Sequence, residues 1–105
     1  SRDQLIEDAL AVQAAGAFAV VLELVPAELA TEVSKLLTIP TIGIGAGAGT
    51  DGQILVWTDF AGLHAGKPRK FVKRYLELRS DLVKAAAAYR NEIASGEFPT
   101  QENEF

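Results

Sequence analysis

The sequence contains no cysteine, and this absence removes a whole class of chemistry. Without thiols the chain can form no disulfide framework and no thiolate metal site, and it has no cysteine nucleophile. A reducing compartment suits such a composition, so we expect a cytoplasmic protein.

The chain also has fewer basic than acidic residues. Its formal net charge is −4, and its isoelectric point is near 4.9. A general nucleic-acid binder carries a basic surface, so we expect no nucleic-acid partner. The longest apolar runs, residues 14–22 and 85–88, are far shorter than the ~20 residues that a membrane span needs. We therefore expect no membrane partner. No signal peptide is expected within residues 1–15 either, because they carry Asp3, Glu7 and Asp8 inside an amphipathic pattern.

The first half of the sequence alternates helical and strand patterns. Ser1 is typical of a helix N-cap and forms a capping box with Gln4, and Gly16 is placed to end that helix. Residues 17–22 are apolar without alternation, which predicts a parallel strand buried on both faces. A second helix after Pro26 would bury one face, formed by Leu29, Val33, Leu36 and Leu37, before a second strand at residues 38–44. This order predicts a βαβ unit with a parallel sheet.

The middle of the chain is less regular. A flexible glycine-rich loop is predicted over residues 45–52, followed by a third strand at 53–57. A parallel crossover normally takes a dozen or more residues, so either the crossover helix has degenerated into this loop or residues 53–62 are helical. The strand is favoured because Ile54, Val56 and Trp57 prefer extended structure.

The last third is predicted to be helical. One helix would start at Phe71, and a second would be capped again at Ser80 and Asp81. The second helix would have one apolar face and end at Gly96; that face contains Leu82, Ala86, Tyr89 and Ile93. Three parallel strands with flanking helices indicate either a small α/β sandwich or part of a (β/α)₈ barrel, which takes ~250 residues.

Glu23 is the most unusual residue in this pattern, because it directly follows six apolar residues. It stands at the carboxyl end of a predicted parallel strand, where active sites of such sheets lie. A desolvated carboxylate there would serve as a general base. The alternative is that Glu23 begins an exposed loop and caps the next helix.

The other candidates have simpler interpretations. The glycines of residues 43–52 match neither the Walker nor the dinucleotide pattern, so a loop that passes close to other groups is favoured over a phosphate site. Asp51 and Asp59 are more typical of turns than of metal ligands. His64, the only histidine, fits a surface loop, and Trp57 fits a core or an interface.

A basic cluster precedes and enters the predicted helix at Phe71; its members are Lys67, Arg69, Lys70, Lys73 and Arg74. The favoured interpretation is a solvated helix face. The alternatives are a subunit contact or a site for an anionic cofactor tail.

Several long segments resemble ketopantoate hydroxymethyltransferases. Residues 16–30 resemble strand six of that family and its following helix, and residues 39–47 and 51–57 resemble strands seven and eight. Residues 71–75 and 98–105 fit its C-terminal helices and tail. The resemblance covers essentially the whole chain, in order. It implies a single partial domain, residues 1–105, from the C-terminal part of a (β/α)₈ barrel.

Within that domain, residues 1–63 would be the last strands and helices of the barrel, and 64–105 the C-terminal helices and tail. The first residue is serine rather than methionine, which also hints at truncation or processing.

The resemblance implies an activity and its partners. The family transfers a hydroxymethyl group from 5,10-methylenetetrahydrofolate to 3-methyl-2-oxobutanoate, giving 2-dehydropantoate for pantothenate synthesis. Mg²⁺ chelates the keto acid, and a carboxylate at the position of Glu23 removes the proton on C3. The Mg²⁺ ligands are expected upstream of Ser1, and a homo-oligomer, a decamer in the family, is expected.

This chain differs from the family at several positions, namely Leu24, Thr50, Thr58 and Asn103, where cysteines or histidines are common. Alone it is expected to be an inactive fragment. The alternatives are a non-catalytic or self-associating α/β module and a related barrel lyase that acts on another keto acid.

Overall fold

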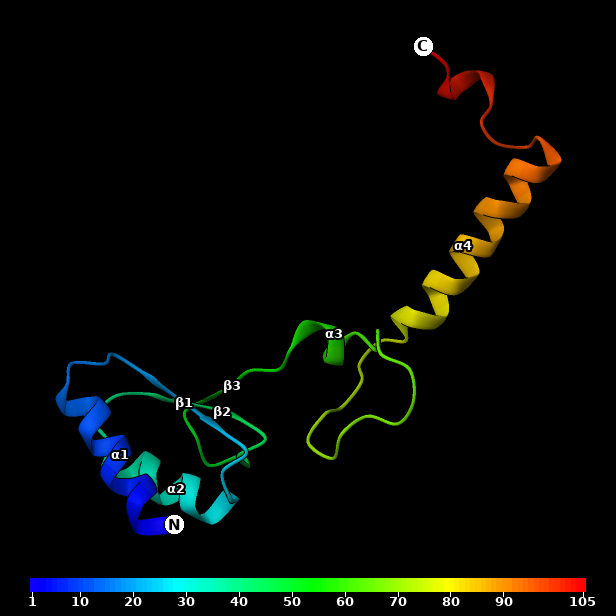
Figure 1. The fold of residues 1–105 in the computed structure, drawn as a ribbon. Coiled ribbons are helices and arrows are strands. Elements are labelled where there is room, and N and C mark those ends of the chain that lie inside the picture. The colour runs from blue at the N-terminus through cyan, green and yellow to red at the C-terminus, as the bar shows by residue number, and fades with distance from the viewer. The chain divides into compact units, whose positions relative to one another are not determined.

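The computed structural model describes residues 1–105. The chain forms two compact units. The first comprises Ser1–Val56 and Lys70–Val72, and the second comprises Trp57–Arg69 and Lys73–Phe105. The first unit contains the sheet and two helices, and the second contains the long C-terminal helix α4 (Figure 1).

Helix α1, Arg2–Ala14, begins and ends as the sequence predicts. The side chain of Ser1 accepts a hydrogen bond from the backbone N–H of Gln4 at 3.3 Å, which confirms the N-cap. The Gln4 side chain does not complete a capping box, because it donates to Asp8 at 2.9 Å. Gly16 has a φ of 102°, and its N–H bonds to a carbonyl of the last turn, which stops the helix.

Three parallel strands form one sheet in the order β1-β2-β3, which confirms the predicted α/β class. The first strand, β1, is Val20–Glu23, and β2 is Thr41–Ile44. Both are shorter than predicted, and Phe18, which precedes β1, is 90% exposed. Glu23 is the last residue of β1 and lies opposite Ile44 in the register.

The third strand, β3, is only Gly52–Gln53, so the predicted strand at residues 53–57 is wrong beyond its first residue. The short helix α3, Trp57–Phe60, follows it. Each of the two alternatives is thus partly right: a loop replaces the crossover helix, and a helix begins inside residues 53–62. Trp57 is 64% exposed and belongs to no core within the chain.

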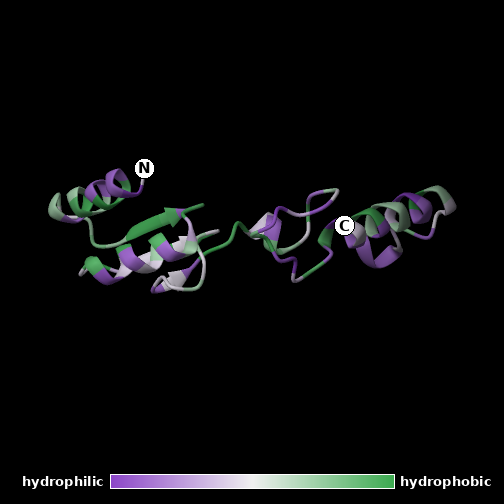
Figure 2. Cartoon of the chain, turned by 90° about the horizontal axis from the view of Figure 1, so that it is seen from below, coloured by the Kyte–Doolittle hydropathy of each residue, from purple (hydrophilic) through white to green (hydrophobic).

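The core lies where α1 and α2 pack against β1. Helix α2 is Ala27–Leu36, with Pro26 at its N-cap. The buried cluster draws on both helices, β1 and the following loops, and consists of Ala9, Leu22, Val25, Ala30, Val33, Leu37 and Ala46. In Figure 2 the strand and the adjoining turns of these helices are hydrophobic. Leu36, predicted to belong to the apolar face of α2, is instead 48% exposed.

Only one face of β1 is covered, so the prediction of a strand buried on both faces is wrong for this chain. Leu22 is 4% exposed, whereas its neighbour Val21 is 51% exposed. Successive side chains of a strand point to opposite faces, and both core helices contact the Leu22 face. Val21 and Glu23 therefore share the uncovered face.

The C-terminal segment departs most from prediction. No helix starts at Phe71; α4 begins only at Leu78 and runs to Ser95. Ser80 and Asp81 lie within its first turn instead of capping a new helix. Before α4 the chain is held by tertiary contacts, since the Tyr75 N–H bonds to the Phe60 carbonyl at 2.9 Å and the two rings stack with centroids 5.2 Å apart.

Helix α4 ends as predicted at Gly96, whose φ is 83°. The tail contains one short 3₁₀ helix, η1, at Gln101–Asn103. None of the helices combines the length and the hydrophobicity that crossing a membrane requires.

Candidate functional site

Glu23 ends β1 with an exposed carboxylate on the uncovered face of the sheet. The expected burial of this side chain is not met within the chain, because both core helices lie on the other face. The carboxylate forms no hydrogen bond or ion pair. It does not cap the next helix either, since the α2 N-cap is Pro26 and has no side-chain cap bond. The alternative interpretation, in which Glu23 caps the next helix, is therefore wrong.

Leu24, directly after Glu23, is the only non-glycine residue with a positive φ, at 53°. A bulky side chain in this left-handed region is uncommon and costs about 1–2 kcal/mol. The Leu24 N–H donates to the Ile44 carbonyl at 2.9 Å, one step beyond the paired residues of β1 and β2. This strained turn fixes the direction of the chain immediately after Glu23. No pattern in the sequence predicted a positive φ at this position.

Asp51 forms hydrogen bonds with a buried residue of β2. Its Oδ2 accepts hydrogen bonds from the Thr41 backbone N–H at 2.8 Å and from the Thr41 hydroxyl at 3.2 Å. Thr41 is completely buried, and its hydroxyl also lies 2.7 Å from the Ser34 hydroxyl on α2. These bonds attach the end of the glycine-rich loop to β2.

The glycines of this loop allow it to pack closely on α2. A Cβ at Gly47 would lie 2.5 Å from the Cβ of Ala27, and one at Gly49 would collide with the side chain of Thr31. Gly47 also has a φ of 77°, where a side chain is strained. The favoured interpretation of residues 43–52, a loop that needs close approach, is confirmed.

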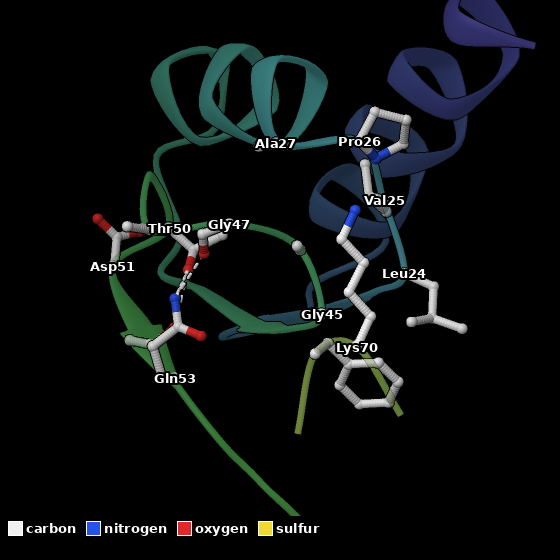
Figure 3. A pocket seen from close by; sticks show the side chains of 14 residues that line it. Leu24, Val25, Pro26, Ala27, Gly45, Gly47, Thr50, Asp51, Gln53 and Lys70 are labelled. Atoms are coloured by element: carbon white, nitrogen blue, oxygen red, sulfur yellow. Dashed lines mark hydrogen bonds between the residues drawn. The ribbon is translucent and has the colours of Figure 1, made fainter. Parts of the chain in front are cut away.

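A pocket of about 920 Å³ opens beside this loop, at the carboxyl ends of β1 and β2. Its walls come from four short segments of the first unit, residues 24–27, 45–48, 50–53 and 70–71. Figure 3 shows the Gln53 amide directed at the loop, where its nitrogen donates to the Gly47 carbonyl at 2.7 Å and to the Thr50 hydroxyl at 3.2 Å. The pocket adjoins Glu23 through Leu24.

The remaining candidates lie in the second unit. The His64 Nε2 atom is 3.5 Å from Asp59 Oδ1 and 3.2 Å from the Thr58 hydroxyl, and the His64 side chain is 60% exposed. This agrees with the predicted surface loop. The structure contains no group of three or more histidine, aspartate or glutamate side chains that could hold a metal ion.

The basic cluster does not lie on a helix, so the predicted helix face is wrong. Its residues precede α4 and have separate surroundings. Arg74 donates to the His64 carbonyl at 2.9 Å, and the Lys73 ammonium lies 4.8 Å from the centre of the Tyr75 ring. Lys70 instead borders the pocket of the first unit.

Comparison with known proteins identifies the family of this chain. The family model described as ketopantoate hydroxymethyltransferase matches residues 1–101. The chain belongs to this family. The resemblance inferred from the sequence is thereby confirmed.

Relatives named 3-methyl-2-oxobutanoate hydroxymethyltransferase match nearly the whole chain. The relative from Streptomyces avermitilis is 60% identical over 100 residues, which is 95% of this chain and 35% of the relative. The relative from Frankia casuarinae is 58% identical over 96% of this chain and 34% of its own length. A relative from Mycobacterium sp. (strain KMS) is 55% identical over 98% and 36%. The chain thus spans about a third of the length of the curated relatives it matches.

Proposed function

We propose that the protein carrying this chain transfers a hydroxymethyl group from 5,10-methylenetetrahydrofolate to 3-methyl-2-oxobutanoate, giving 2-dehydropantoate for pantothenate synthesis. The observation that carries the proposal is the match of 55–60% identity over nearly the whole chain to relatives with that name. The same proposal includes a cytoplasmic homo-oligomer and a (β/α)₈ barrel, of which β1, β2 and β3 are three strands.

Glu23 is the general base in this proposal. Its carboxylate takes the proton from C3 of the keto acid, and the electron pair of the broken C–H bond forms the enolate. C3 then bonds to the one-carbon unit of the folate, water supplies the hydroxyl oxygen, and tetrahydrofolate leaves. The position of Glu23 at the carboxyl end of β1 supports this role, as does its lack of any competing partner.

The uncovered face of the sheet is compatible with a reaction site to which residues outside this chain also contribute. Glu23 and Val21 lie on this face. In a closed barrel the same face lines the interior, where exclusion of water strengthens a carboxylate base. The remaining two thirds of the length of the relatives would supply that enclosure.

Mg²⁺ is part of the proposed reaction, but the residues of this chain do not fit a site for it. No group of three or more carboxylate or imidazole side chains converges anywhere in the structure, and Mg²⁺ prefers several oxygen ligands in octahedral geometry. Asp51 is already engaged by Thr41. The Mg²⁺ ligands therefore belong to residues outside this chain.

The test is a chimera in which this chain replaces the matching third of the Streptomyces avermitilis relative. In it, Glu23→Gln is expected to lower kcat for 2-dehydropantoate formation by about 10²–10⁴-fold, the usual contribution of a general base. The control is Glu28→Gln, an exposed carboxylate in the first turn of α2, which should retain normal kcat. Normal kcat in the Glu23→Gln chimera would remove Glu23 from the mechanism.

The 105-residue chain by itself is expected to have no transferase activity, because it offers a base without a metal site. The assay is 2-dehydropantoate formation by the purified chain with both substrates and Mg²⁺. Measurable turnover would contradict the assignment of the metal ligands to residues outside this chain.

A further inference from the structure

Leu24 breaks the alternation of side chains that begins in β1. Leu22 points into the core and Glu23 to the uncovered face, so an extended chain would bury Leu24 next. Instead Val25 joins the buried cluster at 8% exposure, and Leu24 is 58% exposed. The left-handed φ of 53° at Leu24 redirects the chain at this point. The direction of Glu23 is thereby separated from that of the residues that follow it.

The stability of the first unit does not account for a leucine at residue 24. Its side chain lies outside the buried cluster, and a leucine with a φ of 53° is strained where a glycine is not. Strained backbone of this kind persists only where the surrounding structure enforces it, and it gathers at functional sites. The strained residue here directly follows the proposed base.

Contacts from two sides hold the strained turn. The Leu24 N–H donates to the Ile44 carbonyl at 2.9 Å. The side chains of Leu24 and Phe71 both lie against Gly45, since a Cβ added to Gly45 would be 2.7 Å from Leu24 Cδ2 and 3.1 Å from Phe71 Cγ. Figure 3 shows Leu24 beside Gly45, where the loop begins. The missing side chain of Gly45 is what leaves room for both neighbours.

Phe71 reaches this turn from far along the chain. It belongs to the short segment Lys70–Val72, which is part of the first unit although the residues on either side belong to the second. Val72 anchors the segment, since it is only 9% exposed, and Phe71 itself is partly buried. The segment thus places an aromatic ring on the turn that follows Glu23.

The Glu23 carboxylate has no side-chain partner in the structure, so its direction depends on the backbone of β1 and of the turn. We propose that Leu24 and Phe71 are positioning residues for this carboxylate. Together they hold the backbone after Glu23 rigid, so that the carboxylate meets C3 of the keto acid in the geometry that proton transfer requires. The inference rests on the proposed function and extends it to two residues that act through Glu23.

The test is solvent exchange of the C3 hydrogen of 3-methyl-2-oxobutanoate by the chimera, with Mg²⁺ and without folate. Leu24→Gly keeps the left-handed φ accessible but removes the side chain that lies beside Phe71. It is expected to lower kcat for exchange by about 10–100-fold, because a misplacement of about 1 Å costs on the order of 10²-fold. KM for the keto acid should change less than about twofold, and Tm should stay the same or rise.

Leu36→Gly is the matched control. Leu36 is also half exposed, at 48%, but it is the last residue of α2 and precedes the amino end of β2, away from Glu23. Glycine destabilises a helix, so this variant should lower Tm and leave kcat within about twofold. A lower kcat without a lower Tm at residue 24, and the reverse at residue 36, separates positioning from a structural role.

Two further variants examine the side-chain contact itself. Leu24→Met has a similar volume and should keep kcat within about twofold of the unaltered chimera. Phe71→Ala should lower kcat by about the same factor as Leu24→Gly, and the double variant should fall no further, because both changes remove one shared contact. Normal kcat in both Leu24→Gly and Phe71→Ala would overturn the proposal, as would losses that multiply in the double variant.

Failure of the positioning and failure of the proposed function give different results. If Glu23→Gln abolishes exchange while the Leu24 and Phe71 variants exchange normally, only the positioning is wrong. If the unaltered chimera does not exchange the hydrogen, or if Glu23→Gln exchanges it equally fast, Glu23 is not the base and the positioning fails with it.

Discussion

The first unit of the chain has a buried apolar core, whereas helix α4 in the second unit has no buried residue. Leu22 is 4% exposed and Val33 1%, but Leu82 is 49% and Ile93 46% exposed. Both regions have regular apolar spacing. The difference is that β1 gives α1 and α2 a surface to pack on, while no residue of α4 is buried. An apolar stripe becomes a core only where the same chain supplies its partner.

The largest difference between the units is expected in paired truncations, Leu22→Ala and Leu82→Ala, in the 105-residue chain. The first removes a buried side chain from the core cluster and should lower the free energy of unfolding by about 2–5 kcal/mol. The second removes a half-exposed side chain and should change it by less than about 0.5 kcal/mol. Urea denaturation followed by circular dichroism measures both free energies of unfolding. Equal decreases in the two variants would contradict the difference between the units.

A smaller effect is expected from the two aspartates. Asp51→Ala leaves the buried Thr41 N–H without an acceptor, which should cost about 1–3 kcal/mol. Asp59→Ala removes only a 3.5 Å contact to the exposed His64, an interaction usually worth about 0–1 kcal/mol. Denaturation midpoints compare the variants. If Asp59→Ala costs as much as Asp51→Ala, the loop is not pinned in the way described.

The two left-handed residues Leu24 and Gly96 should respond in opposite directions. Leu24→Gly relieves the strain of a positive φ and should be neutral or stabilising by about 1 kcal/mol, while Gly96→Ala introduces the same strain and should cost about 1 kcal/mol. No atom lies within 4 Å of a Cβ at Gly96, so a steric clash does not confuse the result. Thermal unfolding of the two variants measures the sign, and a large loss with Leu24→Gly would contradict the strain at residue 24.

The smallest expected effect is that of Mg²⁺ on the isolated chain. With no group of ligands in either unit, millimolar Mg²⁺ should leave Tm unchanged, because only a ligand that binds the folded state shifts unfolding. A clear rise in Tm would reveal a metal site within these residues.

Sequence patterns predicted the local elements well and the tertiary effects poorly. The helix ends at Gly16 and Gly96 follow from short-range backbone chemistry and are confirmed. The helix predicted from Phe71 is wrong, because Tyr75 binds the backbone and ring of Phe60, far away in sequence. Tertiary contacts of this kind cannot be recognised from the spacing of apolar residues within one segment.

In the candidate site, too, local features were predicted correctly, whereas features that depend on tertiary packing were not. The position of Glu23 at a strand end followed from the apolar run before it and is confirmed. The sequence left open whether Glu23 is buried or exposed, because burial depends on which faces the rest of the protein covers. The left-handed turn at Leu24 was missed for the same reason, since a positive φ at a leucine arises from packing.

The most direct test of the account is solvent exchange of the C3 hydrogen of 3-methyl-2-oxobutanoate, followed by NMR in D₂O without folate. This measurement isolates proton removal from the later bond formation. The account predicts that the chimera with Glu23 exchanges this hydrogen and that Glu23→Gln lowers the rate by at least about a hundredfold, while Glu28→Gln does not. Equal exchange rates with and without the Glu23 carboxylate would contradict the central claim that this residue is the base.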